Sequence, residues 1–298
     1  MKKAVSISLG SHTRDATIVV TLNDEQIQVE RIGTDGDVGK ARRLLEELDG
    51  EVDALSVDGV DLYVRLDERE YPFNAALRLI ENVRHTPTLD GRGLKRTLDR
   101  RIFGLTAPAL GGLPRFRRAF IPVIVDCLDL SEAVAEVSEE IIIGDLMVAL
   151  GIPIPLHGLE QYRKVARVVL PLVSHLPIGM LYRGSRTERA PKCRRFCEKA
   201  DVIAGDFLSI VDCLSTTLKG KTIITNGTTA EDINLLQERG ARRVITTTPQ
   251  YDGWSFSTNL MEAVLTAYAG KRRRLDDGEL NALINELDLR PTVQWLNK

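Results

Sequence analysis

Five short apolar runs in the C-terminal part of the chain constrain its fold more than any other feature of the sequence. Segments with helical periodicity lie between these runs. Strands that are apolar on both faces and alternate with helices are typical of a parallel sheet covered on both sides. We therefore predict an α/β fold with a Rossmann-like parallel sheet. The runs are residues 120–125, 140–144, 201–205, 222–225 and 244–246.

One strand–helix–strand unit is especially clear in this region. The strand at 222–225 is followed by Thr228-x-x-Glu231, which fits the capping-box pattern of a helix start. The helix then ends at Gly240, just before the strand at 244–246. Parallel strands joined in this way form a right-handed crossover.

The N-terminal third has a different pattern, with short strands and helices in mixed order. Residues 16–22 and 26–32 predict a hairpin, residues 37–48 predict an amphipathic helix, and residues 75–84 predict a further helix. Residues 104–114 are rich in glycine and proline, which indicates a linker. We predict a smaller mixed α/β domain over residues 1–108 and a Rossmann-like domain over residues 115–298.

Composition limits the class of protein. Apolar residues make up 43% of the chain and charged residues 28%, which is ordinary for a globular protein, and a net charge of −2 argues against nucleic acid as a partner. Four cysteines are too few for a disulfide scaffold, so we expect reduced thiols, and no ligand spacing predicts a metal. Without a signal peptide or a membrane-length apolar run, we expect a cytoplasmic protein with no membrane partner.

Small polar and acidic residues follow four of the predicted strands. Ligands of open parallel sheets bind at the carboxyl ends of the strands, so we expect a cofactor cleft there. Asp145 and Asp206 could hold ribose hydroxyls, a metal or a shared proton. For every one of these positions, the alternative is that the residue only caps the helix that follows. The residues expected to bind a cofactor are Asp145, Gly205, Asn226, Gly227, Thr228, Thr229, Thr247 and Thr248, and Asp206 is a candidate catalytic base.

A basic stretch lies between the two predicted domains. Residues 84–118 hold nine Lys or Arg and two Asp or Glu, and glycines and cations open the helix that contains Lys95 and Arg96. Such a helix start suits a phosphate or carboxylate, although a solvated basic face is the alternative. Few aromatic residues interleave the cations, which disfavours nucleic acid. We expect a small anionic metabolite, with Lys95 as candidate base and His12, Arg14, Arg96 and Asn259 as substrate-binding residues.

Several segments spread over the chain resemble a bacterial family known as quinate 5-dehydrogenase. The resemblance implies oxidation of a cyclic polyhydroxy acid of the quinate or shikimate type with NAD or NADP, and related dehydrogenases use a Lys–Asp pair and a glycine-rich nucleotide loop. Neither that loop nor the Asn-x-Thr-x-Pro-x-Lys spacing occurs here. The resembling segments are 32–37, 144–153, 202–206, 246–249 and 255–263.

These observations favour a nicotinamide-dependent oxidoreductase and leave two alternatives. The missing glycine loop favours a non-redox transferase or lyase acting on a phosphorylated or nucleotide ligand. The lack of a familiar catalytic motif favours a metabolite-binding protein without catalysis. The amphipathic helix expected at 278–288 must pack on its own chain or across a homodimer.

Overall fold

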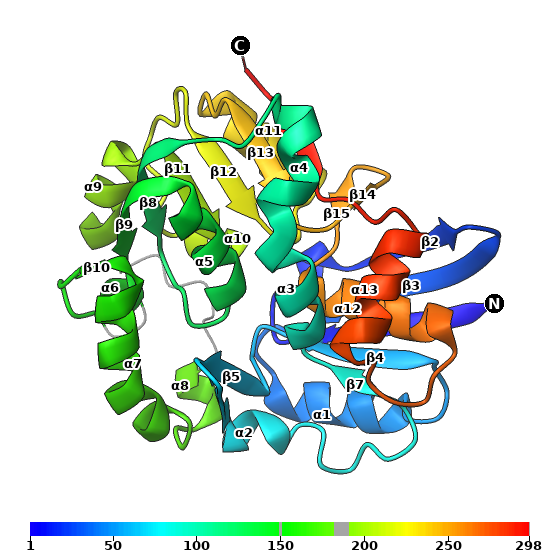
Figure 1. Cartoon of the computed structure of the whole chain (residues 1–298). Helices are drawn as coiled ribbons and strands as arrows, with labels where there is room; N and C mark the ends of the chain where they lie inside the picture. Colours follow the sequence, from blue (N-terminus) through cyan, green and yellow to red (C-terminus); the bar gives the residue numbers. More distant parts are fainter. Residues whose placement is uncertain (149–150, 182–190, 298) are drawn as a thin grey trace. The chain divides into compact units, whose positions relative to one another are not determined.

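A computed structural model describes residues 1–148, 151–181 and 191–297 (Figure 1). The chain divides into two compact units. The first contains residues 1–97, 168–184 and 257–289, and the second contains residues 98–167, 185–256 and 290–298. Predominantly parallel sheets with helices between the strands confirm the predicted α/β class.

The first unit is built on a five-stranded sheet. Its strand order is β2-β3-β1-β4-β7, with only β2 antiparallel to its neighbour. Helices α1 and α12 lie on opposite faces of this sheet, and α3 and α13 pack together over α12 (Figure 1). The elements are β1 (Lys2–Ser8), η1 (His12–Arg14), β2 (Ala16–Leu22), β3 (Glu25–Gly33), α1 (Val38–Glu47), β4 (Ala54–Asp58), β5 (Tyr63–Leu66), β6 (Arg69–Pro72), α2 (Asn74–Leu77), β7 (Thr88–Leu89), α3 (Arg92–Thr97), α8 (Ile178–Leu181), α12 (Thr258–Ala269) and α13 (Asp277–Glu286).

The second unit is built on a seven-stranded sheet of order β10-β9-β8-β11-β12-β13-β16. The five central strands are parallel, and the two edge strands are antiparallel to their neighbours. The elements are η2 (Asp99–Arg101), α4 (Ile102–Leu110), β8 (Phe116–Ile121), α5 (Leu128–Glu136), β9 (Ser138–Ile143), α6 (Asp145–Val148), β10 (Leu156–His157), α7 (Gly158–Val173, which continues into the first unit), α9 (Pro191–Lys199), β11 (Val202–Gly205), α10 (Phe207–Val211), β12 (Thr222–Thr225), α11 (Ala230–Glu238), β13 (Arg243–Thr246), β14 (Gln250–Tyr251), β15 (Trp254–Ser255) and β16 (Thr292–Trp295).

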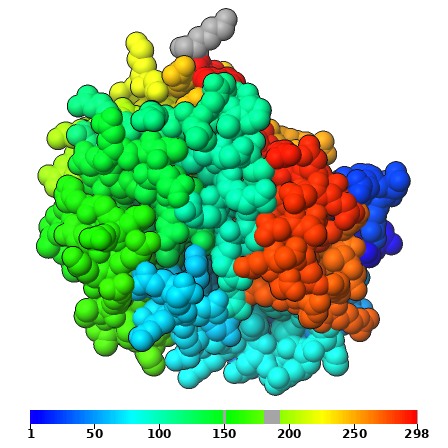
Figure 2. Space-filling view, viewed as in Figure 1, coloured from blue at the N-terminus to red at the C-terminus, as the bar shows by residue number. Residues whose placement is uncertain are grey.

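The units differ from the predicted domains of residues 1–108 and 115–298, because the chain returns to the first unit near its end. Helix α12 is buried at ten consecutive positions, 258–267, and packs on β1 and β4. Helix α13 buries only Leu280 and Ile284 and packs on α3 of its own chain, while its other face is on the surface, orange-red in Figure 2.

Three local predictions were wrong. The 104–114 segment is not a linker, because α4 runs through it to Leu110 and contains Pro108 in its last turn. The strand expected at 120–125 is Phe116–Ile121, since Pro122 has no N–H for a ladder. The helix predicted at 75–84 is only one turn long, Asn74–Leu77.

The capping box of α11 is displaced by one residue from the prediction. The side chain of Thr229, not that of Thr228, accepts from the N–H of Asp232, and the Asp232 carboxylate accepts from the N–H of Thr229. Thr228 is instead bridged to Ser255, with both N–H···O distances 3.0 Å. An extended backbone in that bridge moves the helix start one residue on.

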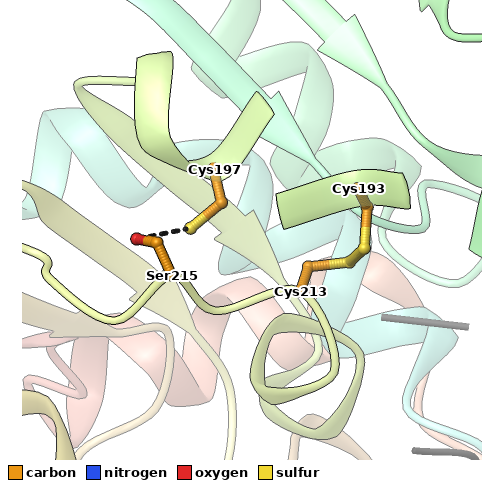
Figure 3. The surroundings of a disulfide bond; sticks show 4 residues. All are labelled: Cys193, Cys197, Cys213 and Ser215. Atoms are coloured by element: carbon orange, nitrogen blue, oxygen red, sulfur yellow. Dashed lines mark hydrogen bonds between the residues drawn. A yellow bond between two sulfur atoms is a disulfide. The ribbon is translucent and has the colours of Figure 1, made fainter. Parts of the chain in front are cut away.

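Two of the four cysteines are joined, so the expectation of reduced thiols was wrong for this pair. A disulfide links Cys193 of α9 to Cys213, with the two Cα atoms 5.4 Å apart (Figure 3). Cys197, on the same helix, lies beside Ser215 with Sγ and Oγ 3.6 Å apart, and burial raises the pKa of its thiol. Cys127 is also buried and is not part of a disulfide. None of the described helices is long and apolar enough to cross a membrane.

Candidate functional site

The site residues predicted from the sequence fall into two groups, one in each unit. The first unit holds Lys95 and the expected substrate-binding residues His12, Arg14, Arg96 and Asn259. The second unit holds every expected cofactor-binding residue and Asp206.

Lys95 forms a pair with Asp61 in the first unit. Lys95 Nζ lies 3.1 Å from Asp61 Oδ1, and the two side chains are only 15% and 21% exposed. Asp61 stands three residues beyond β4, at the carboxyl edge of the five-stranded sheet. Sequence reasoning missed it, although an acidic residue just after a predicted strand was the signal applied elsewhere in the chain. An amine and a carboxylate at this distance can exchange a proton with each other and with a bound hydroxyl group.

Helix α3, which carries Lys95, is fixed by a buried carboxylate. Glu262 of α12 is fully buried, and its Oε2 accepts from the backbone N–H groups of Gly93 and Leu94 at 3.0 and 3.1 Å. The anion expected at this helix start is therefore present within the chain itself. Arg274 binds the other oxygen of Glu262 at 2.9 Å and Oδ1 of the buried Asp90 at 2.6 Å.

The segment that carries Asp61 is tied to the same helix. The guanidinium of Arg92 on α3 lies 4.0 Å above the ring of Tyr63, two residues after Asp61. Arg92 also binds Glu70 on the neighbouring strand β6 at 2.9 Å. These contacts and the Glu262 network hold both halves of the Lys95–Asp61 pair in place.

Two expected substrate-binding residues make contacts that hold the fold. Arg96 forms a two-bond ion pair with Asp277, with distances of 2.8 and 3.0 Å, and this pairing raises the pKa of the guanidinium. Asn259 is buried, and its Nδ2 donates to the carbonyl oxygen of Val57 at 2.7 Å. Gly91 faces Asn259 so closely that a Cβ would lie 2.5 Å from the amide oxygen, and its φ of +80° also requires glycine.

The other two expected substrate-binding residues lie in η1, after β1. The His12 ring Nδ1 lies 2.8 Å from Asp35 Oδ2, and its backbone N–H donates to Oδ1 of the same carboxylate at 3.0 Å. The hydrogen bonds from His12 lower the pKa of Asp35. Arg14 follows at the end of η1 and is half-buried.

In the second unit, the acidic residues at the strand ends bind backbone N–H groups. Asp145 follows β9, and its Oδ2 accepts from the N–H of Ile124 at 2.8 Å. Asp206 caps α10 through Leu208 and Ser209 at 3.0 and 3.2 Å. Strand β8 lies between β9 and β11, so the strands that carry the two carboxylates are not neighbours.

Threonine and serine hydroxyl groups lie near the carboxyl ends of β12 and β13. The turn that contains Asn226 and Gly227 follows β12 directly. Thr248 Oγ1 lies 2.9 Å from Ser255 Oγ and donates to the carbonyl oxygen of Phe256. Gly205 ends β11 with φ of +142°, where a side chain would be strained. Among the described residues, no group of three His, Cys, Asp or Glu could hold a metal. Buried side-chain hydroxyls at this edge without a hydrogen-bond partner belong to Thr225, Thr228 and Thr247.

Comparison with known proteins gives two family matches. Residues 93–296 match the profile described as Domain of unknown function (DUF8754), and residues 3–90 match that described as Domain of unknown function (DUF8753). No curated protein matches the sequence.

Solved structures show weak similarity. The malic enzyme of Entamoeba histolytica has 12% identity and a TM-score of 0.34, over 85% of this chain and 53% of that one, so the chain spans about half of its length. The NAD-dependent malic enzyme of Thermotoga maritima has 11% identity and a TM-score of 0.36, over 95% and 75% of the two chains. A Caulobacter myo-inositol binding protein has 10% identity and a TM-score of 0.35, over 98% and 93%. These scores are too low to carry a functional argument.

Proposed function

We propose that this chain, which belongs to the family described as Domain of unknown function (DUF8754), acts on a cyclic polyhydroxy acid through proton transfer at Lys95 and Asp61. The observation that carries the proposal is the Nζ–Oδ1 distance of 3.1 Å in a pair that is largely shielded from solvent. The resemblance to quinate 5-dehydrogenases supports the choice of substrate, because related dehydrogenases use a Lys–Asp pair.

The two residues of the pair have different roles, since Lys95 acts as the base and Asp61 stabilises the charge that forms on it. A neutral amine at Lys95 Nζ takes the proton of a substrate hydroxyl, and the Asp61 carboxylate stabilises the ammonium that forms. In the reverse direction, the ammonium returns that proton to the substrate oxygen. Because Glu262 fixes the first turn of α3, Lys95 reaches this position without ordering a loop.

A nicotinamide cofactor would accept a hydride from the carbon that bears the hydroxyl. The residues of the second unit fit this cofactor only in part. Asp145, after β9, stands where a dinucleotide-binding sheet places a ribose-binding carboxylate. The β8–α5 turn, residues 122–127, has no glycine for the diphosphate and contains Asp126 instead. The turn therefore does not fit NAD or NADP, and we assign the pair to proton transfer alone.

The same misfit favours a second candidate function. A non-redox enzyme, such as a lyase, needs a proton-transferring pair but no hydride acceptor. In that reaction Lys95 and Asp61 keep the roles given above.

Turnover of quinate and of shikimate tests the proposal. Substrate loss is followed by mass spectrometry with NAD, with NADP and without either. We expect Lys95→Met to lower turnover at least 100-fold, a size typical of a lost acid–base group. Lys164→Met changes an exposed lysine on α7 and is the matched control. Full turnover in both Lys95→Met and Asp61→Asn would overturn the assignment. Turnover only with NAD or NADP would support oxidation, and turnover without them would support the lyase.

A further inference from the structure

We propose a phosphate-binding site at the amino-terminal edge of the seven-stranded sheet, formed by Arg242 and Arg243 beside Trp295. The site lies within the second unit, at the opposite end of the strands from the predicted cofactor cleft, and does not depend on the function proposed for Lys95. Its ligand is a phosphate dianion, either free or as part of a phosphorylated metabolite, and the experiment separates these two sources.

The ends of two neighbouring strands bring the three residues together. Arg243 is the first residue of β13, and it pairs across the antiparallel ladder with Trp295, the last residue of β16. The guanidinium carbons of Arg243 and Arg242 lie 5.0 and 5.3 Å from the centre of the Trp295 ring, a cation–π distance. The carbonyl oxygen of Arg242 accepts from the N–H groups of Leu296 and Asn297 at 3.0 and 3.2 Å. One aromatic ring therefore holds two cations at a fixed end of the sheet.

The charge of Arg243 is the independent sign of an anion. The residue is only 8% exposed, and its Nε donates to the hydroxyl of Thr222 at 3.0 Å. Among the residues that the structure describes, neither Arg243 nor Arg242 makes an ion pair with a carboxylate. Burial lowers the pKa of Arg243, and the positive charge of Arg242 lowers it further, but an arginine keeps its proton in proteins. Buried charges are normally paired, so this guanidinium calls for a counter-ion.

The terminal nitrogens of Arg243 are placed to bind that counter-ion. Within the described part of the chain, Nη1 and Nη2 make no hydrogen bond, yet neither is closed off from solvent. Arg242 is exposed beside them. A guanidinium donates two parallel N–H groups to a phosphate, and two adjacent guanidiniums offset both charges of a dianion. A single carboxylate would offset only one of them.

The charged groups around the two arginines do not take the place of this ligand. Lys221 Nζ donates to two carbonyl oxygens at the end of α9, at 2.6 and 2.7 Å, and Arg239 donates to a loop carbonyl oxygen at 3.2 Å. The carboxylate of Asp201, next to the start of β12, accepts from a backbone N–H of β8 at 2.9 Å. Glu238 is exposed at the end of α11. The further cations add positive potential that attracts an anion to this edge.

Fluorescence of the full-length protein tests the site. Trp254→Phe leaves Trp295 as the single tryptophan, and sodium chloride keeps the ionic strength constant. The probes are inorganic phosphate, AMP and adenosine. We expect a saturable change in Trp295 emission with phosphate and with AMP, and none with adenosine. Calorimetry of the unaltered protein should give the same affinities.

The affinities identify the source of the phosphate. Equal affinity for phosphate and AMP indicates that the phosphate group alone is recognised, and tighter binding of AMP indicates that the site also contacts the rest of a phosphorylated metabolite. Failure of both anions to give a saturable change at millimolar concentration would overturn the proposal. Binding of adenosine as tight as that of AMP would overturn it too.

Variants separate a defined site from general attraction by positive charge. Arg243→Met and Arg242→Met should each weaken phosphate binding about tenfold or more, the loss expected for one charge-assisted contact. Arg242 is exposed, so its variant tests the site even if Arg243→Met fails to fold. Lys219→Met, at an exposed position of the same edge, is the matched control and should bind phosphate like the unaltered protein, as should Lys95→Met. Unchanged affinity in either arginine variant, or an equal loss in Lys219→Met, would refute the site.

Discussion

Glu262 and Arg274 form an ion pair in the core of the first unit, with Oε1 of the carboxylate 2.9 Å from Nη2 of the guanidinium. Glu262 is fully buried, and the side chain of Arg274 is 25% exposed. The second carboxylate oxygen binds the first turn of α3, two positions before Lys95. The pair therefore joins α12, the segment before α13 and the helix of the candidate site in one network.

Replacing Glu262 tests this network. Glu262→Gln removes one of the two buried carboxylates that pair with Arg274, and it turns an amide donor toward backbone N–H groups or the guanidinium. Breaking a buried pair on one side costs about 3–5 kcal/mol, so we expect a loss of that size in the free energy of unfolding from urea denaturation. Glu286→Gln, at an exposed position on α13, is the control and should change stability little. A loss below about 1 kcal/mol would contradict the role of the pair.

The capping box of α11 gives a test between two adjacent threonines. Thr229→Ala removes a hydroxyl that caps the helix, and loss of such a cap costs about 1 kcal/mol. Thr228→Ala removes a buried hydroxyl with no partner, so it should cost clearly less in urea unfolding. Equal losses in the two variants would show that the start of α11 does not depend on this cap.

The local pattern of apolar and polar residues was enough to predict the central strands of the second unit. Residues 222–225 form β12 as predicted, and β11 and β13 differ by one residue at their starts from the predicted runs. A short apolar run with polar ends indicates a strand that is buried on both faces. Such strands can therefore be identified from the sequence alone. The run at 120–125 failed because apolar residues continue past Pro122 into a buried loop.

Contacts between residues far apart in the sequence could not be predicted from such local patterns. The apolar helix at 258–269 could complete either core, and only its fit against β1 and β4 assigns it to the first unit. Asp61 and Lys95 are 34 positions apart, and Cys193 and Cys213 are 20 apart. No local periodicity links residues at those separations, so their pairing emerges only when the sheets form.

The disulfide predicts a thiol count and a stability difference. Closing a loop of this length contributes about 3 kcal/mol, so a reductant should lower the free energy of unfolding by about that amount. Mass spectrometry after alkylation in denaturant should find two modified cysteines, Cys127 and Cys197, before reduction and all four after it. A Cys193→Ser variant should lose its sensitivity to the reductant. Four reactive thiols in freshly purified, unreduced protein would contradict the disulfide.

The lowered pKa of Asp49 predicts how the stability of the protein depends on pH. Burial tends to raise its pKa, but the backbone N–H groups of Arg84, His85 and Thr86, at 2.7 to 2.8 Å, outweigh this and lower it below 3.8. A carboxyl group with a lowered folded-state pKa stabilises the protein above its unfolded-state pKa, and that stability is lost as pH falls through the folded-state value. We therefore expect urea stability to fall below about pH 4, and to fall less steeply in Asp49→Asn. Asp252→Asn, at an exposed turn, should retain the slope of the unaltered protein, and an equal slope in Asp49→Asn would contradict this assignment.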